Sequence, residues 1–129
     1  MDKNVDKFNL RKVILDEYLQ IEEGLKLGGG IEFNSDFKSI TISGMGGSAL
    51  PGNVLRIFIN STFKDSGKKR LEVFQNRFYI LPPEAYENSL NFICSYSGNT
   101  EETISSFEEA LENDLPCVGI SNGGKIEEM

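Results

Sequence analysis

Two short segments place hydroxyl and glycine residues where an anion could be bound. In one, the apolar run Leu90–Ser95 leads into Tyr, Ser, Gly, Asn and Thr and then into a helical pattern. In the other, Ser39–Ser43 leads into Gly-Met-Gly-Gly-Ser-Ala at 44–49. Each pattern is typical of a strand, a tight turn and a helix N-terminus, where unpaired N–H groups and the helix dipole favour phosphate. The sequence therefore predicts a site for a phosphate ester.

The elements that must position these segments alternate between strand and helix. The strands are expected over 38–43, 71–75, 90–95 and 116–121, the helices over 5–27, 49–60 and 100–113 and from 125, and loops over 31–37 and 61–70. Phe78–Leu81 competes with 71–75 for the second strand. In the third helix Ile104, Phe107, Ala110 and Leu111 share one face. The alternation predicts an α/β fold with a parallel sheet and right-handed crossovers.

In an open parallel sheet, ligands bind beyond the carboxyl ends of the strands. Ser43–Ser48, Ser95–Thr100 and Ser121–Gly124 all follow predicted strands, so we expect them to share one rim. A simpler interpretation exists for each segment alone, because glycines serve sharp turns and Thr100 or Asn99 could only cap a helix. The coincidence of two hydroxyl-rich loops favours phosphate binding.

Composition limits the class of protein. The chain has 129 residues, 39% of them hydrophobic, which suits one globular domain. Its net charge of -7 and pI near 4.6 argue against a nucleic-acid partner. No apolar run approaches a membrane span, and the first residues lack the apolar core of a signal peptide, so we expect a cytoplasmic protein without a membrane partner.

Cys94 and Cys117 lie in apolar, strand-like runs, which is typical of reduced, buried thiols. The chain has no histidine, so the commonest general base and metal ligand is missing from it. No G-x-G-x-x-G or P-loop spacing occurs, which disfavours a nucleotide. A compact phosphate monoester held by Ser and Thr hydroxyls fits better, and we expect neither a metal nor an organic cofactor.

Three segments together resemble a known family: Gly-Met-Gly-Gly-Ser-Ala at 44–49, Ser-Tyr-Ser-Gly-Asn-Thr-Glu-Glu-Thr at 95–103 and Ser-Asn-Gly-Gly-Lys-Ile at 121–126. In this order they are similar to the N-terminal sugar isomerase (SIS) domain of the bifunctional phosphoglucose/phosphomannose isomerases. The resemblance implies a three-layer α/β sandwich with a parallel, flavodoxin-like sheet. It divides the chain into an N-terminal amphipathic helix at 1–30 that packs on the domain, and an SIS domain at 31–129 that lacks its last strand.

The resemblance also implies the roles of particular residues. Ser95, Ser97 and Thr100 would grip the phosphate, with Ser48 and the amides of Gly46 and Gly47 near the sugar. The ligands implied are glucose 6-phosphate, mannose 6-phosphate and fructose 6-phosphate, and the assembly implied is a homodimer. The family's glutamate base, ring-opening histidine and arginine lie downstream of the matched region, so the catalytic residues of this chain are unknown. Pro51 and Asn53 depart from the family pattern beside the first loop.

Three functional hypotheses follow. The chain is the sugar-phosphate-binding part of an aldose–ketose isomerase, a non-catalytic sugar-phosphate-binding module, or an inactive truncated remnant. The absence of histidine motivates the second hypothesis. The third is motivated by the missing edge strand, because a four-stranded sheet would leave apolar surface and strand edges exposed.

Overall fold

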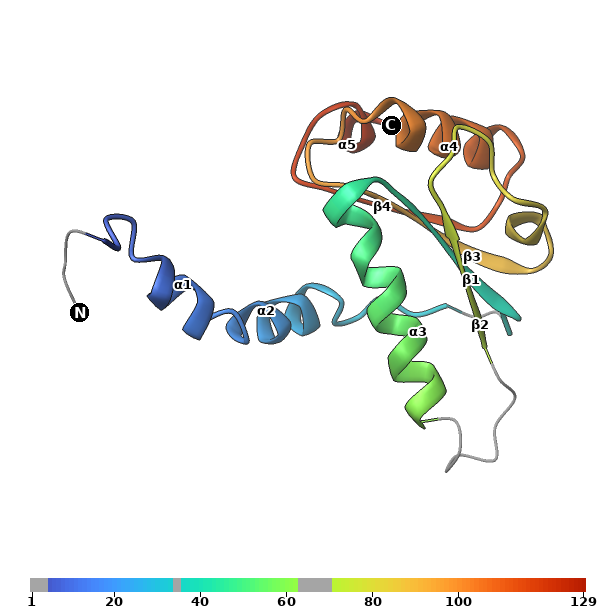
Figure 1. Cartoon of the computed structure of the whole chain (residues 1–129). Helices are drawn as coiled ribbons and strands as arrows, with labels where there is room; N and C mark the ends of the chain where they lie inside the picture. The colour runs from blue at the N-terminus through green and yellow to red at the C-terminus, as the bar shows by residue number, and fades with distance from the viewer. Residues whose placement is uncertain (1–4, 34–35, 63–70) are drawn as a thin grey trace. The chain divides into compact units, whose positions relative to one another are not determined.

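The computed structural model describes residues 5–33, 36–62 and 71–129. The chain divides into two units, Met1–Ser35 and Asp36–Met129 (Figure 1). Most of the expected loop at 61–70 lies outside the described residues, although Ser61 and Thr62 belong to a helix rather than to a loop. Within the described ranges, no helix has the length and hydropathy needed to cross a bilayer.

The first unit corrects the expectation of one helix over 5–27. It contains two helices, α1 (Leu10–Leu15) and α2 (Leu19–Leu27). Helix α1 begins at Leu10 and not at residue 5, because the carboxylate of Asp6 accepts the N–H groups of Leu10 and Arg11, at 2.6 and 3.1 Å. Between the helices, the N–H groups of residues 19–21 bond carbonyls three residues back, so the α-helical pattern is interrupted. That this segment packs on the second unit stays a prediction.

The second unit is built on a four-stranded parallel sheet in the order β2-β1-β3-β4. Its strands are β1 (Ser39–Gly44), β2 (Glu72–Asn76), β3 (Ser89–Ser95) and β4 (Cys117–Ser121). All four predicted strands are confirmed, and Phe78–Leu81 forms none. The order matches the first four positions of the flavodoxin-like arrangement, which confirms the predicted fold class.

The helices lie on both faces of the sheet, so the second unit has three layers (Figure 1). Neighbouring residues of β2 show this, because successive side chains of a strand point to opposite faces. Gln75 donates to the carbonyl of Ala49 at 2.8 Å, directly before α3 (Leu50–Thr62). Asn76 donates to the hydroxyl of Ser106 at 3.1 Å, within α4 (Glu101–Glu112). The remaining helical elements are η1 (Gly46–Ala49), η3 (Pro83–Tyr86) and α5 (Lys125–Glu128).

The apolar core lies mainly between the sheet and α4. Ile93 of β3, Phe107 of α4 and Ile126 of α5 form one buried cluster. Leu81, Ala85 and Ala110 form another. The predicted inner face of α4 is confirmed at Phe107 and Ala110, whereas Leu111 is 44% exposed. This packing holds α4 and α5 against β3.

Polar side chains share this buried layer. Thr41 and Ser89 are hydrogen-bonded across β1 and β3 at 3.0 Å, and the amide of Asn76 also donates to Ser43 at 3.3 Å. Asn91 donates to the carbonyls of Ala85 and Pro116, at 3.1 and 3.2 Å. Because each bond joins two elements, these polar groups fix the register of the strands as well as satisfying buried donors.

Helix α3 is apolar on two opposite faces. Gly52 is buried, and Leu55 and Ile59 are half-buried on the sheet side. The outer face carries four exposed apolar side chains: Leu50 (57% exposed), Val54 (66%), Ile57 (68%) and Phe58 (61%). We call these four residues the α3 stripe. A helix that is apolar on both sides is typical of one packed on both sides.

Candidate functional site

The first loop of the candidate site connects β1 to α3. Gly44 ends the strand with little room, because a Cβ atom there would lie 2.8 Å from the carbonyl oxygen of Ser48. Gly46 has a φ angle of +53°, which favours glycine, and the N–H of Ser48 donates to the carbonyl of Met45 at 3.0 Å. The turn exposes Gly46 and Gly47 and leaves Ser48 half-buried.

The second loop connects β3 to α4. Ser95 is buried, with 2% of its surface exposed, and its hydroxyl is hydrogen-bonded to that of Thr100 at 2.9 Å. Ser97 is exposed and its Oγ accepts the N–H of Asn99 at 3.2 Å. Thr100 occupies the N-cap position without a side-chain capping bond. The structure thus places Thr100 at the helix cap, as the simpler interpretation expects, but its hydroxyl points back to Ser95 and does not cap the helix N–H groups.

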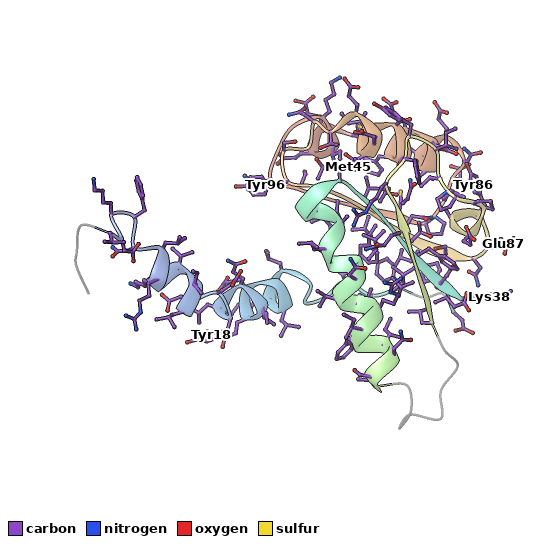
Figure 2. All side chains as sticks on the ribbon, in the orientation of Figure 1. Tyr18, Lys38, Met45, Tyr86, Glu87 and Tyr96 are labelled. Atoms are coloured by element: carbon purple, nitrogen blue, oxygen red, sulfur yellow. The ribbon has the colours of Figure 1, made fainter. Side chains whose placement is uncertain are left out.

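The two loops are in direct contact. The N–H of Tyr96 donates to the hydroxyl of Ser48 at 3.3 Å. Met45 and Tyr96 lie at one end of the second unit, whereas Lys38, Tyr86 and Glu87 lie at the opposite end (Figure 2). The predicted rim at the carboxyl ends of the strands thus exists.

A third loop, Ser121–Gly124, joins the same rim from the end of β4. The N–H of Asn122 donates to the carbonyl of Tyr96 at 3.1 Å, and the N–H of Ile126 donates to that of Gly98 at 3.2 Å. The backbones cross so closely that a Cβ atom on Gly98 would overlap the carbonyl oxygen of Gly123. The φ angle of Gly98 is +64°, so both the backbone conformation and the lack of space for a Cβ atom require glycine at this position.

An open cavity of about 300 Å³ lies between the three loops. Its lining combines hydroxyl and amide groups with apolar walls: Ser48, Pro51, Cys94, Ser95, Tyr96, Ile120, Ser121 and Asn122. Of the predicted site residues, Ser48 and Ser95 line this cavity. Gly46, Gly47, Ser97 and Thr100 lie in the flanking turns and do not line it. Sequence reasoning did not single out Tyr96 or Asn122, which each lie one residue beyond a strand.

The electrostatics around the start of α4 are set by carboxylates. Glu101 and Glu102 occupy its first turn, and the Tyr79 hydroxyl donates to Glu101 at 3.3 Å. The pKa of the Tyr79 phenol is raised, chiefly by the charge of Glu102 and also by burial and by Glu101. An anion bound here would therefore be held by hydroxyl and N–H groups against nearby negative charge.

The cysteine thiols are free, as predicted. Cys94 is buried, which raises the pKa of its thiol to about 11. Cys117 is half-buried, and burial also raises its pKa. Among the described residues, no group of His, Cys, Asp and Glu is arranged to hold a metal ion.

The departures at Pro51 and Asn53 are accommodated in α3. Pro51 lies in the first turn, where a missing N–H is tolerated, and lines the cavity. Asn53 accepts a hydrogen bond from Arg56 at 3.2 Å, on the exposed surface. The helix therefore begins beside the first loop despite both changes.

The fold and the rim define an α/β protein of the parallel, doubly wound class, with its candidate site at the position where such sheets bind ligands. No protein-family profile matches the chain. Curated proteins do match it. A bifunctional phosphoglucose/phosphomannose isomerase of Caldicellulosiruptor bescii is 37% identical over 113 residues, covering 85% of this chain and 32% of that protein.

Proteins with the same name from two other organisms match this chain to a similar extent. The one from Thermoplasma volcanium is 37% identical over 113 residues, covering 84% of this chain and 34% of its own length. The one from Pyrobaculum calidifontis is 32% identical over 128 residues, covering 90% of this chain and 40% of its own length. This chain belongs, as a partial match, to the family of bifunctional phosphoglucose/phosphomannose isomerases. It spans about a third of the length of these relatives, between 32% and 40%.

Proposed function

We propose that this chain is the sugar-phosphate-binding part of an aldose–ketose isomerase that interconverts glucose 6-phosphate or mannose 6-phosphate with fructose 6-phosphate. In this proposal, residues 31–129 form an SIS domain. The observation that carries it is the joining of three strand-end loops at one rim, with Ser48 bonded to Tyr96 and Ser95 to Thr100. The relatives' names supply the substrate class.

The turn at residues 97–100, in which Ser97 and Asn99 are exposed, would hold the phosphate. Because Ser97 Oγ accepts the N–H of Asn99, its own hydrogen is available to donate to a phosphate oxygen. The first turn of α4 adds N–H groups that the side chain of Thr100 does not cap. The sugar would extend toward Ser48 and the glycine amides of the first loop.

The chemistry of isomerisation makes demands that this chain alone does not meet. Moving a proton between C1 and C2 requires a positioned base, and opening the sugar ring requires an acid/base group. The chain contains no histidine, and the Glu101 carboxylate accepts the Tyr79 hydroxyl. We therefore propose that these residues supply binding and that groups outside the sequence supply proton transfer.

A titration followed by amide NMR tests the proposed site. Glucose 6-phosphate is expected to shift the amide signals of residues 46–48 and 95–100, while those of α3 beyond residue 54 stay in place. Shifts spread evenly over the domain, or none at millimolar ligand, would contradict the proposal. Mannose 6-phosphate and fructose 6-phosphate are compared in the same way.

The second candidate function is a non-catalytic sugar-phosphate-binding module, which the absence of histidine favours. Assaying isomerisation of glucose 6-phosphate separates the two. An isomerase part is expected to gain turnover when the chain is combined with the remaining two thirds of a family member, whereas a binding module would bind the ester and stay inactive.

We also propose that the chain forms a homodimer through the α3 stripe. The four exposed apolar side chains of the stripe support this. So does charge, because α3 contains no Asp or Glu although the chain has 20 acidic residues. Two copies that each carry a net charge of -7 approach with least repulsion through a surface without carboxylates.

We propose a cytoplasmic location. The free thiols of Cys94 and Cys117 support it, since reducing compartments keep cysteines in this form.

A further inference from the structure

One side chain, that of Asn99, contacts both the loop before α4 and the loop before α5. Its Nδ2 donates to the carbonyl of Ser97 at 3.0 Å, and its Oδ1 accepts the N–H of Lys125 at 3.3 Å. Its backbone N–H donates to Ser97 Oγ at 3.2 Å. Asn99 thus holds the main chain and the hydroxyl of Ser97 while it holds the start of α5.

The surrounding contacts show that the two loops fit each other tightly. A Cβ atom on Gly124 would overlap the carbonyl oxygen of Ser97 and would lie 2.7 Å from Nδ2 of Asn99. Gly98 is buried against Gly123, and the carbonyl of Gly98 accepts the N–H of Ile126 at 3.2 Å. These backbone contacts hold the two loops side by side, and the Asn99 side chain adds a separate link between them.

We propose that Asn99 is a positioning residue of the site described under the proposed function, on which this inference rests. Its side chain bonds the Ser97 carbonyl and so holds the turn in which the backbone N–H of Asn99 orients the Ser97 hydroxyl toward the phosphate. Through its bond to Lys125 it also couples binding at residues 97–100 to the arrangement of residues 122–125. Asn99 itself touches no ligand. Its side chain acts through the two loops that it joins.

Inorganic phosphate is the probe for this coupling, because it carries the anionic group that residues 97–100 are proposed to hold and has no sugar to contact the other loops. Amide NMR signals of both segments are followed during titration of the whole chain. In the wild type, signals of residues 97–100 and of Gly123 and Lys125 are expected to shift with the same midpoint. A structural role alone does not require this shared response.

In Asn99→Ala, the signals of residues 97–100 are expected to shift at about tenfold higher phosphate, the effect of losing one oriented hydrogen bond. In the same variant, the signals of Gly123 and Lys125 are expected no longer to shift together with those of residues 97–100. Asn113→Ala is the matched control, since Asn113 is an exposed asparagine at the other end of α4 whose side chain donates to the backbone carbonyl of Glu109 at 2.8 Å. It is expected to behave as the wild type.

Unchanged midpoints and a retained shared response in Asn99→Ala would overturn the inference while leaving the proposed function intact. A wild type that binds neither phosphate nor glucose 6-phosphate would overturn both. If Asn99→Ala does not fold, Asn99→Asp decides, because it keeps the acceptor for the Lys125 N–H and loses the donor to Ser97. A folded Asp variant that keeps the response of Lys125 supports the inference, and one that lacks it contradicts the inference.

Discussion

At the scale of single residues, the hydroxyls of the rim differ in what they can offer a ligand. Ser95 is 2% exposed and already paired with Thr100, whereas Ser97 is exposed and has a hydrogen to donate. The sequence predicts that these hydroxyls share a loop, but the loop sequence alone does not say which of them points inward. That depends on the φ angle of Gly98 and on the crossing with Gly123, which follows a different strand, β4.

Replacement of Ser97 tests its role. Ser97→Ala is expected to weaken binding of fructose 6-phosphate about tenfold, because a hydrogen bond to a charged oxygen is lost. Calorimetric titration measures this change. Ser61→Ala is the control, since Ser61 is an exposed serine at the end of α3 that donates to the Phe58 carbonyl. Equal affinities of the two variants would contradict the role of Ser97.

The buried thiol of Cys94 predicts a pH dependence of stability. Burial raises the pKa of this thiol to about 11 from its ordinary value of 9.0. A raised pKa means that the contribution to stability is complete below pH 9 and is lost as the pH rises toward 11. Between pH 8 and pH 10.5, this thiol is expected to lower the unfolding free energy of the wild type by at most about 2 kcal/mol, and Cys94→Ala is expected to lack this decrease. Urea denaturation at the two pH values measures the difference. Parallel pH profiles for the two proteins would show that Cys94 is not responsible.

At the scale of elements, strands were easier to predict than the N-terminal helix. Ser39–Ser43 alternates polar and apolar residues, and Leu90–Ser95 leads directly into a turn, so both strands follow from local pattern. The break between α1 and α2 depends on hydrogen bonds to carbonyls three residues back. Residues 5–27 keep helical periodicity through that break, so the pattern does not reveal it.

Helix α4 also holds the segment that follows β2, through Glu109. Its carboxylate accepts the N–H of Leu81 at 2.8 Å and the hydroxyl of Tyr86. The bond to Glu109 also raises the pKa of Tyr86. Glu109→Ala is expected to lower the unfolding free energy by about 1 to 2 kcal/mol, because a part-buried N–H loses its partner.

Glu108→Ala provides the comparison, as Glu108 is the exposed neighbour on the same helix. Its melting temperature is expected to stay within a degree or two of the wild type, since exposed substitutions are usually near neutral. If both glutamate variants melt alike, Glu109 does not hold the segment.

At the scale of the whole molecule, the α3 stripe is the feature that a sequence pattern explains least. The residues of α3 are apolar at helical spacing on two faces, and only the structure shows that the sheet covers one of them. Ile57→Asn is expected to shift the chain from dimer to monomer in analytical ultracentrifugation, because it places a polar group in the apolar contact. Ile80→Asn is the control, since Ile80 is 73% exposed outside α3. A monomeric wild type would exclude the proposed dimer.

The central claim is that these residues bind the phosphate ester of a sugar. Isothermal titration of the wild-type chain with fructose 6-phosphate, beside an equal titration with fructose, tests it most directly. The account predicts saturable binding of the ester at one site per chain and none of the unphosphorylated sugar. Equal heats for the two ligands, or no binding of the ester at millimolar concentration, would contradict it.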